Sequence, residues 1–290
     1  MLRITDDRTG EPVEAAPVRR GLTRVEAHAP GCDAGALRVL LVADLLVRAL
    51  ELGGTPVWAL LNAERQRDEL RAGAAALGIR PLEDTHDTTT GLGEAQIVHV
   101  AQDPTAAPDG VLVRVGPVVW APGPAASGPE AEADSVDPAA SAPEAPEAQV
   151  AGVAPASAPE AQADEPHRSG ALPPGADPAA VRLALLSVPR AAPVRLDDDA
   201  LADAEATLAR WRRAVAGWAC RPSRPIPDDV RARLRAAWED DLDIPAVLGV
   251  LRGVAEAAPD DLPEGARFET YVYADRLLGL DLARDVGTLP

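Results

Sequence analysis

A stretch between residues 121 and 174 divides this chain of 290 residues into two parts that can fold. It consists almost wholly of Ala, Pro, Glu, Asp, Ser and Gly, has no aromatic residue, and repeats Ser-Ala-Pro-Glu at 141–144 and 157–160. Such a stretch buries too little apolar surface to offset roughly 1–2 kcal/mol of backbone entropy per residue. We predict a disordered acidic linker over 121–174, between domains at 1–120 and 175–290. A functional acidic tail that mimics nucleic acid is the less favoured alternative.

Short apolar runs alternate with helical periodicity in the first 120 residues. The strongest signal is residues 36–52, where apolar side chains recur at helical spacing and Gly53-Gly54 follow as a stop. The other predicted elements are a helix at 63–77 and strands at 2–4, 25–29, 55–61, 96–101 and 111–115. Alternation of strands and helices predicts an α/β domain with a parallel sheet.

Helical signals dominate after residue 175. Pro178 stands in the first turn of one predicted helix, where its missing N–H costs nothing, and Asp197 to Asp199 place acidic residues at the start of another. The predicted helices cover 178–188, 197–218, a segment that Pro227 opens and that carries Trp238, 244–257 and 266–280. Five such helices joined by short loops predict an all-α bundle.

Charge and composition exclude several functions. Every basic residue is Arg, so the chain has no lysine for a phosphate-binding P-loop or for Schiff-base chemistry. The net charge of −18 opposes binding to DNA and makes a tRNA partner doubtful without a local arginine face. The two cysteines lie too far apart in sequence for a metal-ligand spacing. Because no apolar run approaches the ~20 residues of a membrane span, we expect a cytoplasmic protein without membrane contact.

Four segments, in the same order along the chain, carry a resemblance to one family. Residues 2–12 (LRITDDRTGEP) form an opening strand with a turn that ends in Glu-Pro, and residues 36–54 form the helix that follows. In the second half, residues 177–187 (DPAAVRLALLS) and 240–245 (DDLDIP) form the most specific pair. These segments resemble cysteinyl-tRNA synthetase and the related ligase that joins cysteine to glucosaminyl-inositol. The similar pieces span about half of the sequence.

The resemblance implies a truncated Rossmann-like α/β domain of the class I synthetase type, followed by a helical bundle of the type that contacts the anticodon stem. It also implies a remnant nucleotide pocket that contains Asp33, Gly35 and Asn62, so ATP and an amino acid are the possible ligands. Asn62 stands in the strand after the helix, and Asp33 and Gly35 stand in the family's His-Ile-Gly-Asn signature.

The departures from the family bear on catalysis. Asp33 stands where the family has a histidine that stabilises charge on the transferring phosphates, and the chain has no lysine for the family's pyrophosphate clamp. Loss of one transition-state donor typically costs about 10²–10³ in rate. The family also binds zinc, but only His28 aligns with one of its ligands, and one ligand cannot hold the ion. We therefore predict no catalytic residue and no metal site.

Other polar groups have structural interpretations that we favour. His28 and Cys32 are spaced like a metal pair, but Pro30 and Gly31 between them indicate a loop. His86-Asp87 lacks a nucleophile, Gly91-Leu92-Gly93 lacks the third glycine of a dinucleotide site, and His99 reads as a core histidine within an apolar strand. Two arginine stripes are predicted to be solvated faces that pair with carboxylates rather than RNA-binding faces; they comprise Arg210, Arg212 and Arg213, and Arg231, Arg233 and Arg235.

Three functions fit this sequence. The favoured hypothesis is a non-catalytic paralogue that has lost the adenylation motifs and keeps a binding or regulatory role. The alternative is an active ATP-dependent cysteine or aminoacyl ligase in which Arg114 or Arg168 replaces the lysine clamp, although arginine offers a fork rather than a point charge. A third possibility is an interaction scaffold whose acidic linker tethers two modules.

Overall fold

The computed structural model describes residues 1–18, 21–85, 94–103, 105, 110–121, 172 and 175–288. The predicted linker lies outside these residues except for Ala121 and Leu172, as do His86-Asp87, Gly91-Leu92-Gly93 and Arg168. Within the described ranges, no helix combines the length and the apolar character that crossing a bilayer requires.

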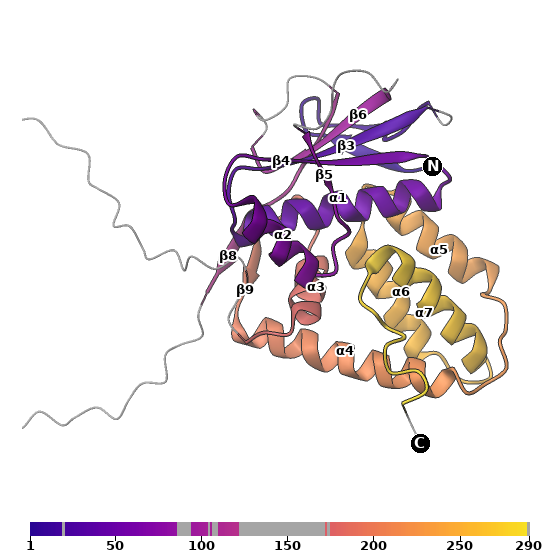
Figure 1. Ribbon diagram of the computed structural model, residues 1–290. Helices are drawn as coiled ribbons and strands as arrows, with labels where there is room; N and C mark the ends of the chain where they lie inside the picture. The colour runs from indigo at the N-terminus through magenta and orange to yellow at the C-terminus, as the bar shows by residue number, and fades with distance from the viewer. Residues whose placement is uncertain are drawn as a thin grey trace, which may run out of the picture. The chain divides into compact units, whose positions relative to one another are not determined.

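A five-stranded parallel sheet forms the centre of the N-terminal half, in the order β5-β4-β3-β6-β7 (Figure 1). Its strands are β3 (Leu22–Ala29), β4 (Val57–Ala63), β5 (Glu83–Asp84), β6 (Glu94–Ala101) and β7 (Val111–Arg114). A separate antiparallel pair consists of β1 (Arg3–Asp6) and β2 (Glu11–Glu14). The parallel sheet predicted from the sequence is confirmed and fits a Rossmann-like α/β domain.

Helix α1 (Ala34–Leu52) connects β3 to β4 and lies along one face of the sheet (Figure 1). Asp33 caps its N-terminus through a side-chain hydrogen bond, and Gly53 ends it. Most side chains of α1 are buried, because the sheet packs against one side of this helix and α7 of the C-terminal half contacts a different side. The shorter α2 (Arg67–Ala76) follows β4 and buries only Leu70 and Ala74.

All five helices predicted in the C-terminal half are confirmed. They are α3 (Pro178–Leu186), α4 (Asp198–Trp218), α5 (Asp228–Glu239), α6 (Ile244–Glu256) and α7 (Glu264–Leu278). Asp177, Asp197 and Asp243 cap the N-termini of α3, α4 and α6 through their carboxylates, as Asp and Asn side chains commonly do. Aromatic contacts hold the long helices together, since Trp211 and Trp218 of α4 both pack edge-on against Tyr271 of α7.

The two halves of the chain share one hydrophobic core. The main cluster of buried side chains includes Leu41 and Leu46 of α1 together with Leu185 of α3 and Leu277 of α7. A short parallel sheet also joins the halves, because β8 (Val118–Trp120) pairs with β9 (Val194–Leu196). The division into two domains stays a prediction, and these contacts show how closely the described parts of the two halves are packed.

A buried charge cluster reinforces this junction. The Asp44 side chain of α1 is 1% exposed and lies 3.1 Å from the guanidinium of Arg182 on α3, which is equally buried. Arg48 and Arg80 also pair with Asp44, at 2.9 and 3.0 Å. Burial lowers the pKa of the Arg182 guanidinium, and the charge of Asp44 partly opposes that shift. The Asp44 carboxylate thus links α1 to two other parts of the chain: the segment that follows α2, through Arg80, and helix α3, through Arg182.

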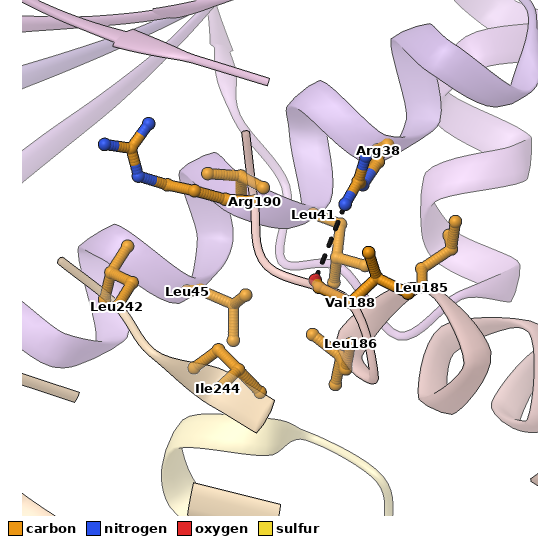
Figure 2. Close-up of a pocket in the computed structure, with 10 residues that line it drawn as sticks. Arg38, Leu41, Leu45, Leu185, Leu186, Val188, Arg190, Leu242 and Ile244 are labelled. Carbon is orange, nitrogen blue, oxygen red and sulfur yellow. Dashed lines mark hydrogen bonds between the residues drawn. The ribbon is translucent and has the colours of Figure 1, made fainter. Parts of the chain in front are cut away.

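Arg38 forms a second link between the halves. Its guanidinium donates hydrogen bonds to the carbonyl oxygens of Gly116, Ala192 and Pro189 at 2.8, 2.6 and 2.9 Å. Burial lowers its pKa to about 10, so the group remains charged at neutral pH. Figure 2 shows Arg38 beside a cavity of about 20 Å³, which has room for roughly one water molecule and none for a nucleotide.

Candidate functional site

The first turn of α1 holds two of the three residues predicted to line a nucleotide pocket. Asp33 Oδ1 accepts a hydrogen bond from the backbone N–H of Ala36 at 2.7 Å. Gly35 is buried, and a Cβ atom at this position would stand 2.6 Å from the side-chain Nε2 of Gln102. A helix N-terminus attracts phosphate through its free N–H groups and its dipole. Here a carboxylate and an amide from the chain itself occupy the space around this turn.

The third predicted residue, Asn62, belongs to a different group of side chains. It lies on β4 in register with His28 of β3, and its Nδ2 is 3.3 Å from Nδ1 of His28. The structure thus brings Asp33 and Gly35 together in one helical turn and places the amide of Asn62 against an imidazole.

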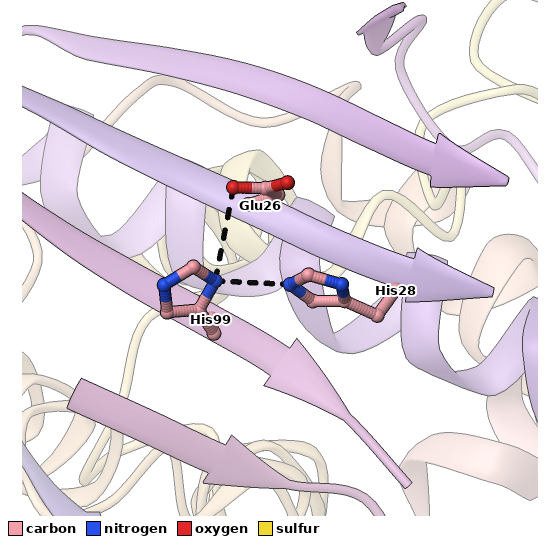
Figure 3. Close-up of side chains that lie close together, drawn as sticks. All are labelled: Glu26, His28 and His99. Atoms are coloured by element: carbon pink, nitrogen blue, oxygen red, sulfur yellow. Dashed lines mark hydrogen bonds and ion pairs between the residues drawn. The ribbon is translucent and has the colours of Figure 1, made fainter. Parts of the chain in front are cut away.

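Glu26, His28 and His99 form a polar cluster on the sheet face opposite α1 (Figure 3). Glu26 and His28 are two residues apart on β3, so their side chains point to the same face of the sheet. The alternate residues Val25 and Ala27 point to the other face and belong to the core shared with α1. His99 lies on β6 in register with Glu26. His28 Nε2 is 2.9 Å from His99 Nδ1, which is 3.7 Å from Glu26 Oε2.

This cluster is buried although it is polar. Glu26 is 6% exposed and His99 5% exposed, and His28 is partly buried. Burial lowers the pKa of His28, and the neighbouring Glu26 carboxylate partly opposes the shift, so the imidazole is neutral at neutral pH. His99 is buried, as predicted for a core histidine, but its contact with His28 was not predicted. Neither Glu26 nor Gln102 was predicted to be a site residue.

Cys32, whose spacing from His28 resembles that of a metal pair, does not belong to this cluster. Cys32 lies in the bend between β3 and α1, as Pro30 and Gly31 indicated, and its backbone N–H donates to the side chain of Gln66 at 3.4 Å. Burial raises the pKa of the Cys32 thiol, followed by the charges of nearby acidic residues. The thiol therefore carries a proton at neutral pH.

One predicted arginine stripe needs a correction. Arg212 is 3% exposed and donates to the carbonyl oxygens of Leu280 and Asp281 at 2.7 and 3.1 Å, so it is a structural residue. It faces inward because α4 packs against the segment after α7. Arg213 on the same helix is exposed.

The second stripe, on α5, pairs with carboxylates as expected of a solvated face. Arg233 lies 3.2 Å from Asp229, and Arg235 lies 3.0 Å from Glu239. Both are exposed pairs one helical turn apart, which contribute little to stability.

Arg114, one candidate for a phosphate clamp, is held by another charge. Its Nε lies 3.3 Å from Asp7 Oδ1 at the end of β7. The structure thus provides this guanidinium with a carboxylate partner from the N-terminal strand pair.

A surface groove of about 680 Å³ lies between α4 and the C-terminal segment. Its charged lining residues are Asp177, Glu205, Arg212, Arg213, Arg284 and Asp285. Carboxylates and guanidiniums thus balance in number, and Arg284 is already 3.3 Å from Asp285. The groove therefore has no excess of positive charge with which to attract a phosphate.

Comparisons with known proteins identify the same relatives that the sequence motifs indicated. The chain is 41% identical over 107 residues to the L-cysteine:1D-myo-inositol 2-amino-2-deoxy-alpha-D-glucopyranoside ligase of Thermobispora bispora. It is 40% identical over 110 residues to the ligase of the same name from Streptomyces griseus, and 43% identical over 112 residues to that of Mycobacterium sp. strain KMS. No family model matches the chain.

These alignments cover 37% of this chain and 25–26% of each relative. The chain thus spans about a quarter of the length of the curated relatives it matches. The resemblance to the cysteine:glucosaminyl-inositol ligases, which are class I enzymes related to cysteinyl-tRNA synthetase, is confirmed over that share of the chain.

Proposed function

We propose that this chain is a non-catalytic relative of the cysteine ligases that forms no aminoacyl-adenylate and has a binding or regulatory role. The observation that carries the proposal is the first turn of α1. There the Asp33 carboxylate takes up the N–H of Ala36, and the amide of Gln102 fills the space beside Gly35. A triphosphate brought to this turn meets a negative charge where an adenylating enzyme needs a positive group or a hydrogen-bond donor.

The absence of lysine from the sequence supports the same conclusion. Transfer of a nucleotidyl group requires cations that neutralise the departing pyrophosphate. Arg114, an arginine considered for that role, is paired with Asp7. Loss of a single donor lowers the rate by about 10²–10³, and several such groups are replaced together here.

An assay of ATP–pyrophosphate exchange with cysteine and with other amino acids tests the proposal. We expect no exchange above background from the full chain. Exchange at ordinary enzymatic turnover, about 1 s⁻¹ or faster, would show that the chain is an active ligase.

A binding experiment tests the physical reason separately. If Asp33 and Gln102 close the site, then Asp33→Asn and Gln102→Ala each raise the affinity for ATP, measured by calorimetry, relative to the unmodified chain. Asp229→Asn removes a carboxylate from an exposed pair on α5 and serves as the matched control. Equal affinities in all four proteins would mean that neither the charge of Asp33 nor the Gln102 side chain beside Gly35 limits nucleotide binding at this turn.

Small-molecule and nucleic-acid partners follow from the same proposal. ATP and an amino acid are the ligands to examine first, because the curated relatives are named as cysteine ligases. The net charge of −18 argues against tRNA, and any tRNA binding should weaken steeply with salt if exposed arginines contact phosphates.

A further inference from the structure

The side chains of Glu26, His28 and His99 bring three potential metal-ligand atoms close together. One potential ligand atom from each of the three residues lies within 4.8 Å of the other two. Two of the separations are 2.9 and 3.7 Å. Ligands about 2.0–2.2 Å from a tetrahedral ion stand roughly 3.3–3.6 Å apart, a range that lies between these two separations.

The carboxylate in this cluster is buried beside two nitrogen-containing side chains. Glu26 is 6% exposed, and its Oε2 lies 3.7 Å from His99 Nδ1. Its closest charged neighbour among the described residues is Arg24, whose guanidinium is 3.7 Å from Oε2. A buried carboxylate is costly unless it is paired, and coordination of a metal is one of the usual ways to offset that cost.

We propose that Glu26, His28 and His99 form a binding site for a divalent transition-metal ion of the Zn²⁺ class. Two imidazole nitrogens and one carboxylate oxygen match the borderline-soft character of Zn²⁺, and three protein ligands leave a fourth position open for water or another ligand. The site lies on two adjacent strands, β3 and β6, whose backbone hydrogen bonds hold the donors in position. It does not depend on whether the chain forms an adenylate.

Asn62 supplies the outer support that metal-bound histidines require. Asn62 Nδ2 lies 3.3 Å from His28 Nδ1, and an N–H donated there requires the proton of neutral His28 to be on Nε2, which is 2.9 Å from His99 Nδ1. For Nε2 to bind a metal, His28 would take its other neutral tautomer, in which the single N–H proton is on Nδ1 instead of Nε2. Rotation of the Asn62 amide by half a turn then presents its oxygen to the Nδ1–H, the usual outer-shell arrangement.

The resemblance to the synthetase family had identified His28 as a lone ligand, too few to hold zinc. The structure adds donors from elsewhere in the sheet: Glu26 on the same strand and His99 on its neighbour. Arg24 is the group that opposes binding, because it shares the carboxylate oxygen of Glu26. A bound ion must therefore compete with, or displace, this guanidinium.

The test is a titration of the full chain after treatment with EDTA. Calorimetry measures Zn²⁺ binding, and visible spectroscopy measures binding of Co²⁺, whose absorption reports coordination number and ligand type. We expect one ion per chain, with the intense bands of four-coordinate Co²⁺ and no charge-transfer band from a thiolate. Glu26→Gln and His99→Gln should each weaken the affinity by about tenfold or more, as loss of even an outer-shell partner typically does.

Cys32→Ser is the matched control, because Cys32 is the other residue whose spacing suggested a metal pair with His28. It should leave both the affinity and the Co²⁺ spectrum unchanged. Glu26→Gln keeps the shape of the side chain and removes a buried charge, so circular dichroism should show an intact fold. The proposal is overturned if the unmodified chain binds no stoichiometric ion, if both variants retain its affinity, or if a thiolate band appears.

Discussion

Replacement of Asp44 by asparagine tests whether the buried charge cluster holds the two halves of the chain together. Asp44 lies on α1, and the guanidinium groups of Arg48, Arg80 and Arg182 all lie within 3.1 Å of its oxygens. The Asp44 and Arg182 side chains are each 1% exposed, so water cannot replace the lost charge. The substitution preserves the shape of the side chain and removes the carboxylate that the three arginines share.

The expected cost can be worked out from the remaining contacts. Removal of one partner from a buried ion pair costs about 3–5 kcal/mol. The lower end applies, because Arg182 keeps hydrogen bonds to the carbonyls of Leu278 and Leu77 at 2.7 and 2.9 Å, and Arg80 keeps Glu51 at 2.7 Å. We therefore expect a loss of about 3 kcal/mol in the free energy of unfolding. For a folded unit of this size, that lowers Tm by about 6–12 °C.

Thermal and urea unfolding followed by circular dichroism measure this loss. Asp229→Asn is the control, because its carboxylate is 73% exposed and pairs with Arg233 one helical turn away, and we expect a change within about 0.5 kcal/mol. A double-mutant cycle with Arg182→Met isolates the pair, since the double variant should lose less than the sum of the single losses. A loss below about 1 kcal/mol for Asp44→Asn, or additive losses in the cycle, would refute this reasoning.

Three further outcomes are expected. Residues 1–120 expressed alone should lack a cooperative unfolding transition by circular dichroism, because their core is completed by side chains from the C-terminal helices; a cooperative transition would mean that the half folds by itself. Tyr271→Phe should lose about 1–2 kcal/mol in urea unfolding, since the buried hydroxyl donates to Leu251 O at 2.8 Å; no loss would mean that the carbonyl finds another donor. Burial raises the pKa of Asp275, so the folded chain holds this proton more tightly than the unfolded chain does. The stability of Asp275→Asn relative to the unmodified chain should therefore rise as pH increases from about 3.9 through the raised pKa, and a flat difference would contradict this.

Long elements could be predicted from the sequence because periodicity and capping residues agree over many positions. The helix predicted at 36–52 is observed at Ala34–Leu52, with Asp33 as its cap. The strands β8 and β9 were missed, because each has three residues and its partner lies more than seventy residues away in the chain. No periodicity can be measured over three residues, so this link between the halves was not visible.

The candidate sites show a similar limit. Asp33 was predicted to line a nucleotide pocket just before the helix at 36–52, and the structure shows it as the cap of that helix, which begins at Ala34. The approach of His99 to His28 could not be predicted, because it requires that β6 pair with β3 in a register that shifts between Leu22 and Thr23. Spacing along the chain suggested only Cys32 as a partner of His28, and Pro30-Gly31 already argued against that pair; the structure places Cys32 in a bend and His28 in a strand.

The residues that carry the resemblance to the ligases hold the fold together in this structure. Asp44 and Arg182 form the buried pair at the junction, and Asp241 accepts hydrogen bonds from Arg190 at 2.6 Å and from the backbone of Thr5 at 2.8 Å. Such residues are needed wherever this architecture folds, whether or not an adenylate forms. The resemblance therefore argues for the scaffold and is neutral on activity. Our proposal that no adenylate forms rests instead on the first turn of α1, where Asp33 supplies a negative charge, and ATP–pyrophosphate exchange by the full chain decides between an enzyme and a binding protein.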